Sequence, residues 1–170
     1  MKFGFKQENW KIVYVFLIAV LLLSLGCESN EEQYENAFQK GKQNIESGEF
    51  KKAEINLKNA LKIRSDNATL HYYLGEAFLK QGKLRNAFQS YQKSISIDPK
   101  YIKPKLRTAA FYLHANRLED SLSSSESVLE QEPENVEALL LHARALGEEV
   151  KYKDAVKDLK KIVEIEPDKV

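Results

Sequence analysis

The side chains that most often carry catalysis or bind metals are few in this chain of 170 residues, and they form no recognisable site. Its three histidines, His71, His114 and His142, are separated by 43 and 28 residues, whereas helical metal-binding motifs place their ligands a few residues apart. Adjacent carboxylates, at residues 31–32 and 148–149, are typical of solvated charges. The sequence contains no glycine-rich phosphate loop and no nucleophile elbow. We therefore expect a protein that is not an enzyme and that uses no metal and no cofactor.

One nucleophile, Cys27, has a sequence context that suggests a specific modification. It follows a start with three lysines (residues 1–11), an uncharged apolar run (residues 12–23) and a short segment that ends in Gly26. This order of positive charge, apolar run and small residues is that of a secretory signal. The apolar run is shorter than the about 20 residues that a transmembrane helix needs. A single cysteine also excludes a disulfide framework and a cysteine-clustered metal site.

Residues 1–27 resemble the signal peptide of a bacterial lipoprotein, in which a small residue directly precedes the cysteine that is lipidated. Ser24 departs from the leucine that this family most often has three places before that cysteine. The resemblance implies a diacylglyceryl thioether on Cys27, cleavage before it and N-acylation. It thus implies a protein anchored by lipid to a membrane of the cell envelope and facing the periplasm, with residues 28–33 (ESNEEQ) as a short polar tether. The alternative is an uncleaved helix that holds a module facing the cytosol.

Charge excludes one class of partner. Lysine and arginine number 26 and aspartate and glutamate 25, so the formal net charge is +1. Proteins that bind nucleic acids usually carry a basic excess or a basic stripe that matches the phosphates. The near balance therefore argues against a nucleic-acid partner, and a lipid anchor rather than surface charge would have to hold the chain at a membrane.

The elements that must position any functional side chain follow a period of 34 residues. Four sets of residues recur at this interval in a single register: Gly41, Gly75, Ala109 and Ala143; Ala53, Ala87, Ser121 and Ala155; Phe50, Leu84, Leu118 and Tyr152; and Ser65, Pro99, Pro133 and Pro167. A fixed period of this length is the mark of a repeat protein. The repeats cover residues 34–67, 68–101, 102–135 and 136–169.

Each period is predicted to form two helices, as the second one shows. An apolar face with Leu74 and Phe78 stops at Gly82, a helix C-terminal signal. A second apolar face runs from residue 84 to 95 at spacings of three and four and stops at Pro99. Small residues in the columns of residues 75 and 87 allow the two helices to approach closely. In the third period, serines at residues 123–125 make the second helix poorly apolar. Since no helix pair can bury its apolar stripe alone, the pairs must stack, and we expect an all-α solenoid of four helix–turn–helix units.

The second period is similar to the consensus of the tetratricopeptide repeat (TPR), a 34-residue unit of two helices. The similarity lies in the segments Tyr73–Phe78, Lys80–Gly82 and Ile97–Pro99. The chain departs from the family at the usual tryptophan near the start of each unit, where it has Ala37, His71, Lys105 and Leu139. The first unit, through the segment Ile55–Leu61, also resembles that of TPR lipoproteins of the PEP-CTERM/exosortase and exopolysaccharide system.

The TPR resemblance implies that the first helices of successive units line a concave groove that holds an extended peptide or a partner helix. Carried onto this sequence, the groove positions are Phe38, Lys42, Tyr72, Tyr73, Glu76, Lys103, Arg107, Leu140 and Arg144. Aromatic anchors flanked by cations suit a partner that carries carboxylates. Lys103 and Arg107 match two places of the family's carboxylate clamp, whereas Lys42 and Tyr73 stand in place of its asparagines. A full clamp is therefore not expected, and the alternative is solvated groove charges with Tyr72 and Tyr73 in inter-repeat packing.

Together these features favour a lipid-anchored, non-enzymatic scaffold for protein–protein interactions in the bacterial envelope, with a protein or peptide in the groove and no small-molecule substrate. The alternatives are the docking arm of an enzyme or sensor whose catalytic domain follows residue 170, and a pilus-assembly or outer-membrane-assembly TPR lipoprotein. No polar capping helix follows the last unit, so we expect the chain to continue and part of its last apolar face to be exposed. The residues concerned are Leu140, Leu146, Val156, Leu159 and Val163.

Overall fold

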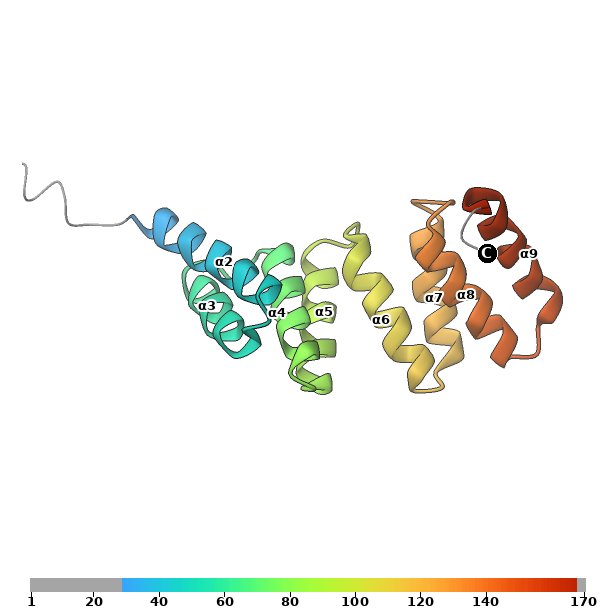
Figure 1. Ribbon diagram of the computed structural model, residues 1–170, viewed down its shortest axis with the longest axis horizontal. Helices are drawn as coiled ribbons and strands as arrows, with labels where there is room; N and C mark the ends of the chain where they lie inside the picture. The colour runs from blue at the N-terminus through green and yellow to red at the C-terminus, as the bar shows by residue number, and fades with distance from the viewer. Residues whose placement is uncertain (1–28, 168–170) are drawn as a thin grey trace, which may run out of the picture. The chain divides into compact units, whose positions relative to one another are not determined.

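The computed structural model describes residues 29–167, and within that range it contains helices and no strand. The helices are α2 (Asn30–Glu46), α3 (Phe50–Ile63), α4 (Ala68–Lys80), α5 (Leu84–Ile97), α6 (Ile102–His114), α7 (Leu118–Leu129), α8 (Val136–Glu148) and α9 (Tyr152–Ile165). They form four helical hairpins, one in each predicted period, which confirms the all-α fold (Figure 1). The predicted signal peptide, with Cys27, lies outside the described residues. Between residues 29 and 167, no helix combines the length and the apolar character that a bilayer span requires.

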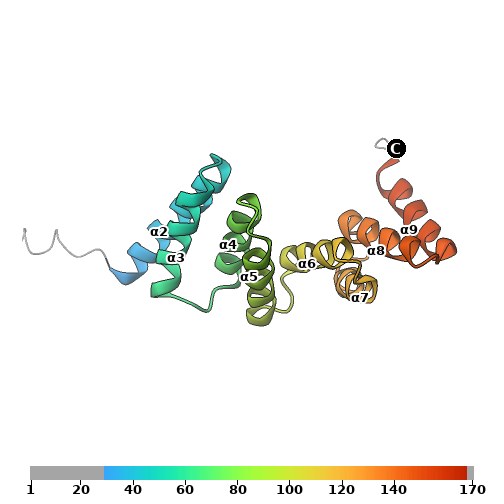
Figure 2. The same ribbon diagram turned by 90° about the horizontal axis from the view of Figure 1, so that it is seen from below.

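The chain divides into a unit of residues 1–33 and a repeat unit of residues 34–170. Within the repeat unit, each hairpin packs against the next along the chain: α3 against α4, α5 against α6 and α7 against α8. Two views at right angles show the same succession of hairpins (Figures 1 and 2). This stacking buries the apolar stripe that an isolated helix pair would expose.

The first helix starts earlier than the sequence suggested. The amide of Glu32 donates a hydrogen bond to Ser29 Oγ at 3.1 Å, and Glu31 and Glu32 lie in the first turn of α2. A serine cap followed by carboxylates satisfies the free amides and the positive end of the helix dipole. Residues 30–33, which we expected in the tether, are therefore helical.

The turns inside the four hairpins share one geometry. The second residue after each first helix has a positive φ: Gly48 (76°), Gly82 (73°), Asn116 (55°) and Val150 (64°). In the second hairpin the amide of Lys83 donates to the carbonyl of Phe78 at 2.9 Å, and the amide of Gly82 donates to that of Leu79. This pair of bonds closes a helix in the Schellman geometry, which suits glycine because other residues are strained at positive φ. Gly82 therefore ends its helix as predicted, and Val150 holds a conformation that its side chain disfavours.

Two glycines allow the helices of a hairpin to touch, as the small-residue columns predicted. A Cβ atom on Gly75 would lie 2.5 Å from the Tyr91 ring, and one on Gly41 would lie 2.6 Å from the Leu57 side chain. Neither distance is compatible with a side chain at these positions. The third and fourth hairpins have Ala109 and Ala143 there instead, so close approach to a large side chain is a property of the first two.

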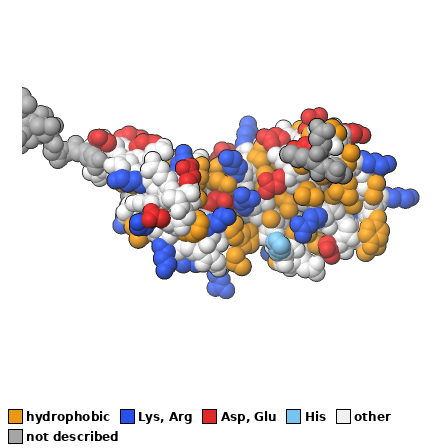
Figure 3. Space-filling model, in the orientation of Figure 1, with side chains coloured by type: hydrophobic (Ala, Val, Ile, Leu, Met, Phe, Trp, Pro, Cys, Tyr) orange, Lys and Arg blue, Asp and Glu red, His pale blue; other side chains and the backbone are white. Residues whose placement is uncertain are grey.

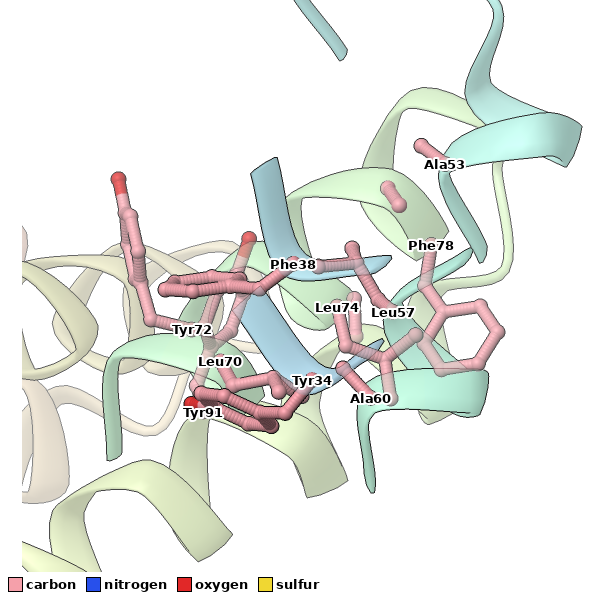
Figure 4. Packing of buried hydrophobic residues seen from close by; sticks show 12 residues of the cluster. Tyr34, Phe38, Ala53, Leu57, Ala60, Leu70, Tyr72, Leu74, Phe78 and Tyr91 are labelled. Carbon is pink, nitrogen blue, oxygen red and sulfur yellow. The ribbon is translucent and has the colours of Figure 1, made fainter. Parts of the chain in front are cut away.

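The repeat unit contains two core clusters. The first is rich in aromatic side chains and includes Tyr34, Phe38, Tyr72, Phe78 and Tyr91 around Leu57, Leu70 and Leu74 (Figure 4). The second consists mainly of leucine and alanine and includes Leu106, Leu113, Leu122, Leu141 and Leu146. Buried serines complete it: Ser121 Oγ donates to the carbonyl of Ala109 at 3.0 Å, and Ser125 Oγ donates to that of Ser121 at 2.9 Å. Because both hydroxyls are bonded, the serine-rich α7 can be buried without an unsatisfied polar group.

The last hairpin exposes apolar side chains, as the sequence predicted. Leu140, Val156, Leu159 and Val163 have exposed fractions of 44–46%. Leu146 differs from this prediction, since only 6% of it is exposed and it belongs to the second core cluster. Figure 3 shows hydrophobic side chains at the surface of this end of the repeat unit, between scattered charges.

Candidate functional site

A row of aromatic rings crosses the first helices of the first two repeats. The Phe38 ring on α2 lies 5.9 Å from the Tyr73 ring on α4, and the neighbouring Tyr72 ring lies 5.4 Å from that of Tyr73. Tyr72 also contacts Tyr101, the residue before α6, with ring centroids 5.5 Å apart. Edge-to-face contacts at such distances add to the energy of burial. The row therefore joins α2, α4 and the residue that precedes α6 by side-chain packing.

A cation covers one end of this row. Lys42 Nζ on α2 lies 5.7 Å from the centroid of the Phe38 ring and 5.5 Å from that of Tyr73. At these distances a lysine ammonium is attracted to the ring faces. Lys42 thus contacts both the repeat that carries it and the next one, and it stands where the family's clamp has an asparagine.

A second cation, Arg107 on α6, joins three first helices. Its Nε donates to Glu76 Oε1 on α4 at 2.9 Å, and its Nη1 donates to Glu137 Oε1 on α8 at 3.2 Å. The Tyr91 hydroxyl also donates to Glu76 Oε1, at 2.6 Å. Glu76 is well enclosed, with 14% of its side chain exposed against 34% for Arg107. Arg107 is therefore already neutralised by the protein's own carboxylates.

The environment of this network shifts several pKa values. Burial raises the pKa of Tyr91, and the hydrogen bond to Glu76 raises it further. Burial also raises the pKa of Tyr72, with Glu76 adding to the rise and Arg107 opposing it. For Tyr101, burial and the adjacent Tyr72 and Tyr73 raise the pKa to about 12. For Arg107, burial alone would lower the pKa, but Glu76 outweighs it and raises the pKa. The hydroxyls therefore stay neutral and Arg107 stays charged at any physiological pH.

The nine predicted groove residues fall into three groups by exposure. Phe38 and Tyr72 are buried, at 8% each. Lys42, Tyr73, Glu76 and Arg107 are half-buried and form two pairs, Lys42 over the Tyr73 ring and Arg107 with Glu76. Lys103, Leu140 and Arg144 are exposed. We call these nine residues, together with Glu137, the first-helix face.

The exposed members extend this face across the last two repeats. Lys103 lies four residues before Arg107 on α6, and Leu140 and Arg144 lie three and seven residues after Glu137 on α8. Residues at these spacings share one side of a helix. Since Arg107 pairs with Glu137, the exposed side chains continue the side of α6 and α8 on which that pair lies. Within the part of the chain that the structure describes, Lys103 and Arg144 form no ion pair, so their charges are available to a partner.

Three residues of this region were not predicted from the sequence. Glu137 occupies a column with Glu35, Thr69 and Lys103, so its position alone did not indicate a pairing with Arg107. Tyr101 precedes its helix, outside the helical pattern. Tyr91 was expected on the apolar face of α5, and only its hydroxyl contact with Glu76 connects it to the site. A comparison of the charge of Arg107 with the charges on the first helix of the next repeat could have predicted its pairing with Glu137.

Two of the three histidines make structural contacts. His71 Nε2 lies 2.9 Å from the carbonyl of Ser65, and burial lowers its pKa. His142 Nδ1 lies 2.6 Å from Asp158 Oδ2, which joins α8 to α9. Among residues 29–167, no group of three or more histidine, cysteine, aspartate or glutamate side chains is arranged to hold a metal ion.

Comparison with known proteins agrees with this architecture. Residues 41–82 match a family described as TPR repeat, and residues 68–101 match a family described as tetratricopeptide repeat. The chain folds as tetratricopeptide repeats. A TPR protein from Parabacteroides merdae of known structure superimposes with a TM-score of 0.75 at 28% identity, over 82% of this chain and 56% of that one. YrrB, described as a TPR protein with an unusual peptide-binding site, superimposes with a TM-score of 0.67 at 21% identity, over 76% of this chain and 66% of that one.

Among curated sequences, the DnaJ homolog subfamily C member 7 homolog of Schizosaccharomyces pombe is 26% identical over 153 residues. These residues are 81% of this chain but 32% of that protein, so the TPR chain spans about a third of its relative's length. The matched families and the superimposed structures thus agree with the helical hairpins in showing a TPR fold.

Proposed function

We propose that this TPR chain is a non-catalytic scaffold, anchored by lipid in the bacterial cell envelope, that binds an acidic protein segment on its first-helix face. The observation that carries the proposal is the contrast between the two kinds of cation on that face. Arg107 is bound by Glu76 and Glu137, whereas Lys103 and Arg144 are exposed on the adjoining helices and form no ion pair within residues 29–167.

The geometry supports a partner with both carboxylates and apolar side chains. Leu140 is 45% exposed and lies on α8 four residues before Arg144. An apolar side chain of the partner could cover Leu140 while its carboxylates pair with Lys103 and Arg144, because charge-assisted hydrogen bonds are strongest where water is excluded. Phe38 and Tyr72 hold the helices in place beneath this surface and do not themselves offer an exposed anchor.

The anchor is supported by the sequence of residues 1–27. The basic start, the apolar run and the Gly26-Cys27 pair together match the signal of a lipoprotein, and two or more acyl chains are needed for stable attachment. The resemblance of the first repeat to TPR lipoproteins of the PEP-CTERM/exosortase system would place the partner in exopolysaccharide or protein-sorting machinery.

The anchor is tested by intact-mass spectrometry of the chain expressed in a bacterium with its own signal. We expect the wild-type protein to lack residues 1–26 and to carry the mass of the acyl groups. Cys27→Ser should keep residues 1–26 and lose that mass. An unmodified, full-length wild-type protein would contradict the lipid anchor while leaving the first-helix face untested by this measurement.

The face is tested by reversing its exposed charges. Lys103→Glu with Arg144→Glu should abolish the capture of acidic partners from an envelope extract through direct repulsion. Arg107 is unsuitable for reversal, because a glutamate there would meet Glu76 and Glu137 and disturb the fold. The matched control is Lys93→Glu with Lys160→Glu, which changes the net charge equally on α5 and α9. If both double variants retain every wild-type partner, the first-helix face is not the binding surface.

A further inference from the structure

A pocket opens between the second and third repeats on a side of the helices that the proposed function does not use. It has a volume of about 400 Å³ and lies between the start of α5 and the end of α6. Its walls are Leu84 and Phe88 of α5 and Phe111 and Tyr112 of α6, with Ala115 at the end of α6. The Phe88 ring lies 5.7 Å from that of Phe111 and 5.3 Å from that of Tyr112, so three packed rings form part of these walls.

The repeat period explains why the space exists. At the junction of the first two repeats, the residue equivalent to Ala115 is Gln81. Gln81 Nε2 reaches across to α3 and donates to the carbonyl of Phe50 and to Glu54 Oε2, each at 3.1 Å. Ala115 has no side chain that could reach the carbonyl of Leu84, the equivalent of Phe50. The equivalent residue at the last junction is Glu149, whose side chain is only 17% exposed. The middle junction is thus the one of the three that has a short residue in this column.

The wall of the pocket at Leu84 is exposed because Ala115 has no long side chain to cover it. Leu84 has an exposed fraction of 56% although it occupies an apolar column of the repeat. A large apolar side chain at the mouth of an apolar pocket loses contact with water when a partner covers it, and that burial favours binding.

The rim of the pocket is cationic. Arg85 is exposed and forms no ion pair among the residues that the structure describes. Arg117 stacks on the Tyr112 ring, with its guanidinium carbon 4.7 Å from the centroid, and pairs with Asp120 at 2.6 Å. His114 is exposed at the same edge. One carboxylate, Asp120, therefore stands against the two arginines, and the rim favours a ligand with negative charge.

We propose that this pocket is a second docking site, which takes a large apolar side chain of a partner protein segment with carboxylates beside it. The apolar side chain fills the place that Gln81 occupies at the first junction, and a carboxylate pairs with Arg85. Such a segment is a short linear motif in an extended or helical stretch of the partner. The site is separate from the first-helix face, since Lys103 and Arg144 are not among the residues that line it.

The test measures the binding of fluorescein-labelled 12-residue peptides to the full chain. The chain is held in lipid nanodiscs, because detergent could occupy the pocket. One peptide carries a central Phe flanked by Glu, a second has Lys in place of Glu, and a third has Ser in place of Phe. Fluorescence anisotropy should show saturable binding of the first peptide only, with at least a tenfold weaker affinity for the other two. Decanoate is added as a competitor that supplies an apolar chain and a carboxylate without a peptide.

The decisive variant is Ala115→Gln, which places the residue of the first junction in the pocket. The backbone accommodates it, because Ala115 and Gln81 have nearly the same conformation (φ −84°, ψ 5° and φ −89°, ψ 0°). It should weaken binding of the Phe–Glu peptide at least tenfold with an unchanged helical signal. Arg85→Glu should remove the preference for the Glu peptide over the Lys peptide. Lys93→Glu with Lys160→Glu, which lies outside both the pocket and the first-helix face, should leave the affinity within twofold of wild type.

Two results would overturn the proposal. Equal binding of the Phe–Glu peptide by wild type and Ala115→Gln would show that the pocket is not its site. Saturable binding of decanoate without saturable binding of any peptide would assign the pocket to a small amphipathic molecule instead of a protein segment.

Discussion

The first two repeats and the last two repeats share one backbone plan but are held together by different side chains. In the first two, Gly41 and Gly75 lie against Leu57 and the Tyr91 ring, and the core is a chain of aromatic contacts. In the last two, the same column holds alanine, and the core consists of leucine, alanine and bonded serines. Only Ala155 of α9 is buried, whereas α5 buries Ala87, Ser90, Tyr91 and Ser94. The TPR plan therefore tolerates two solutions to the same packing problem.

The two halves differ in where their large apolar side chains lie. Aromatic rings bury large areas and contact several neighbours, so the first two repeats have their large side chains inside. Six of the exposed large hydrophobic residues lie in the last repeat: Leu140, Val150, Tyr152, Val156, Leu159 and Val163. We infer that the first half supplies more of the stability, whereas the last repeat offers more apolar surface to a partner.

The largest effect should come from filling the close helix contact of the second repeat. Gly75→Leu places a side chain where a Cβ atom alone would lie 2.5 Å from Tyr91, so the α4–α5 hairpin should separate. We expect a loss of about 3 kcal/mol or more, and unfolding of the second repeat, measured by denaturation followed by circular dichroism. The pair Gly75→Ala with Tyr91→Ser copies the Ala109 and Ser125 of the third repeat. It should lose less stability than the two single changes added together.

The next largest effect should come from the aromatic row. Tyr72→Ala removes a ring that is 8% exposed and contacts the Tyr73, Tyr91 and Tyr101 rings. We expect a loss of about 3 kcal/mol in the free energy of unfolding. Leu140→Ala, on the exposed side of α8, should change it by less than about 0.5 kcal/mol. Equal losses in the free energy of unfolding for Tyr72→Ala and Leu140→Ala would contradict the inference that the first half supplies more of the stability.

Acid should weaken the first junction. Burial alone would raise the pKa of Glu54, but hydrogen bonds from Lys58, Lys83 and Gln81 outweigh it and lower the pKa from 4.5 to about 2. Because the folded pKa lies below the unfolded one, this stability is fully present above about pH 4.5 and is lost as the pH falls toward 2.

Glu54→Gln removes this charge from the junction. It should cost about 1–2 kcal/mol at pH 7 and flatten the decline of stability between pH 4.5 and 2. Hydrogen exchange followed by mass spectrometry should locate the acid-induced opening at α3 and α4. An identical pH profile in wild type and Glu54→Gln would mean that this carboxylate does not control the junction.

The smallest effect should be a gain in the last repeat. Val150 has a φ of 64°, a region that a β-branched residue disfavours and that Gly82 occupies without strain at 73°. Val150→Gly should therefore raise the free energy of unfolding by about 1 kcal/mol, measured in urea. The reverse change, Gly82→Val, should lower it by a similar amount. A destabilised Val150→Gly would show that the valine side chain, although 67% exposed, makes contacts that outweigh its backbone strain.

The sequence by itself determined the repeat plan. The period of 34 carries the hairpin pattern of the second repeat, with its Gly82 and Pro99, to the other three repeats, because helix ends and amphipathic faces are local properties. The groove positions came from the TPR resemblance, which was carried onto the first helix of each repeat. Where the local pattern misled, as at residues 30–33, the cap formed by Ser29 and Glu32 started the helix earlier.

Only the tertiary structure decided which of these positions are available. Tyr72 and Lys103 are both on first helices, yet one is buried against three rings and the other is exposed. Arg107 was predicted as a cation of the groove, and the structure pairs it with Glu76 and Glu137, which lie 31 and 30 residues away in the chain. The pocket at Ala115 depends on a side chain that is missing from a junction between repeats. The physical reason is the same in each case: a period fixes the direction of a side chain, but its burial depends on what the next repeat places opposite it.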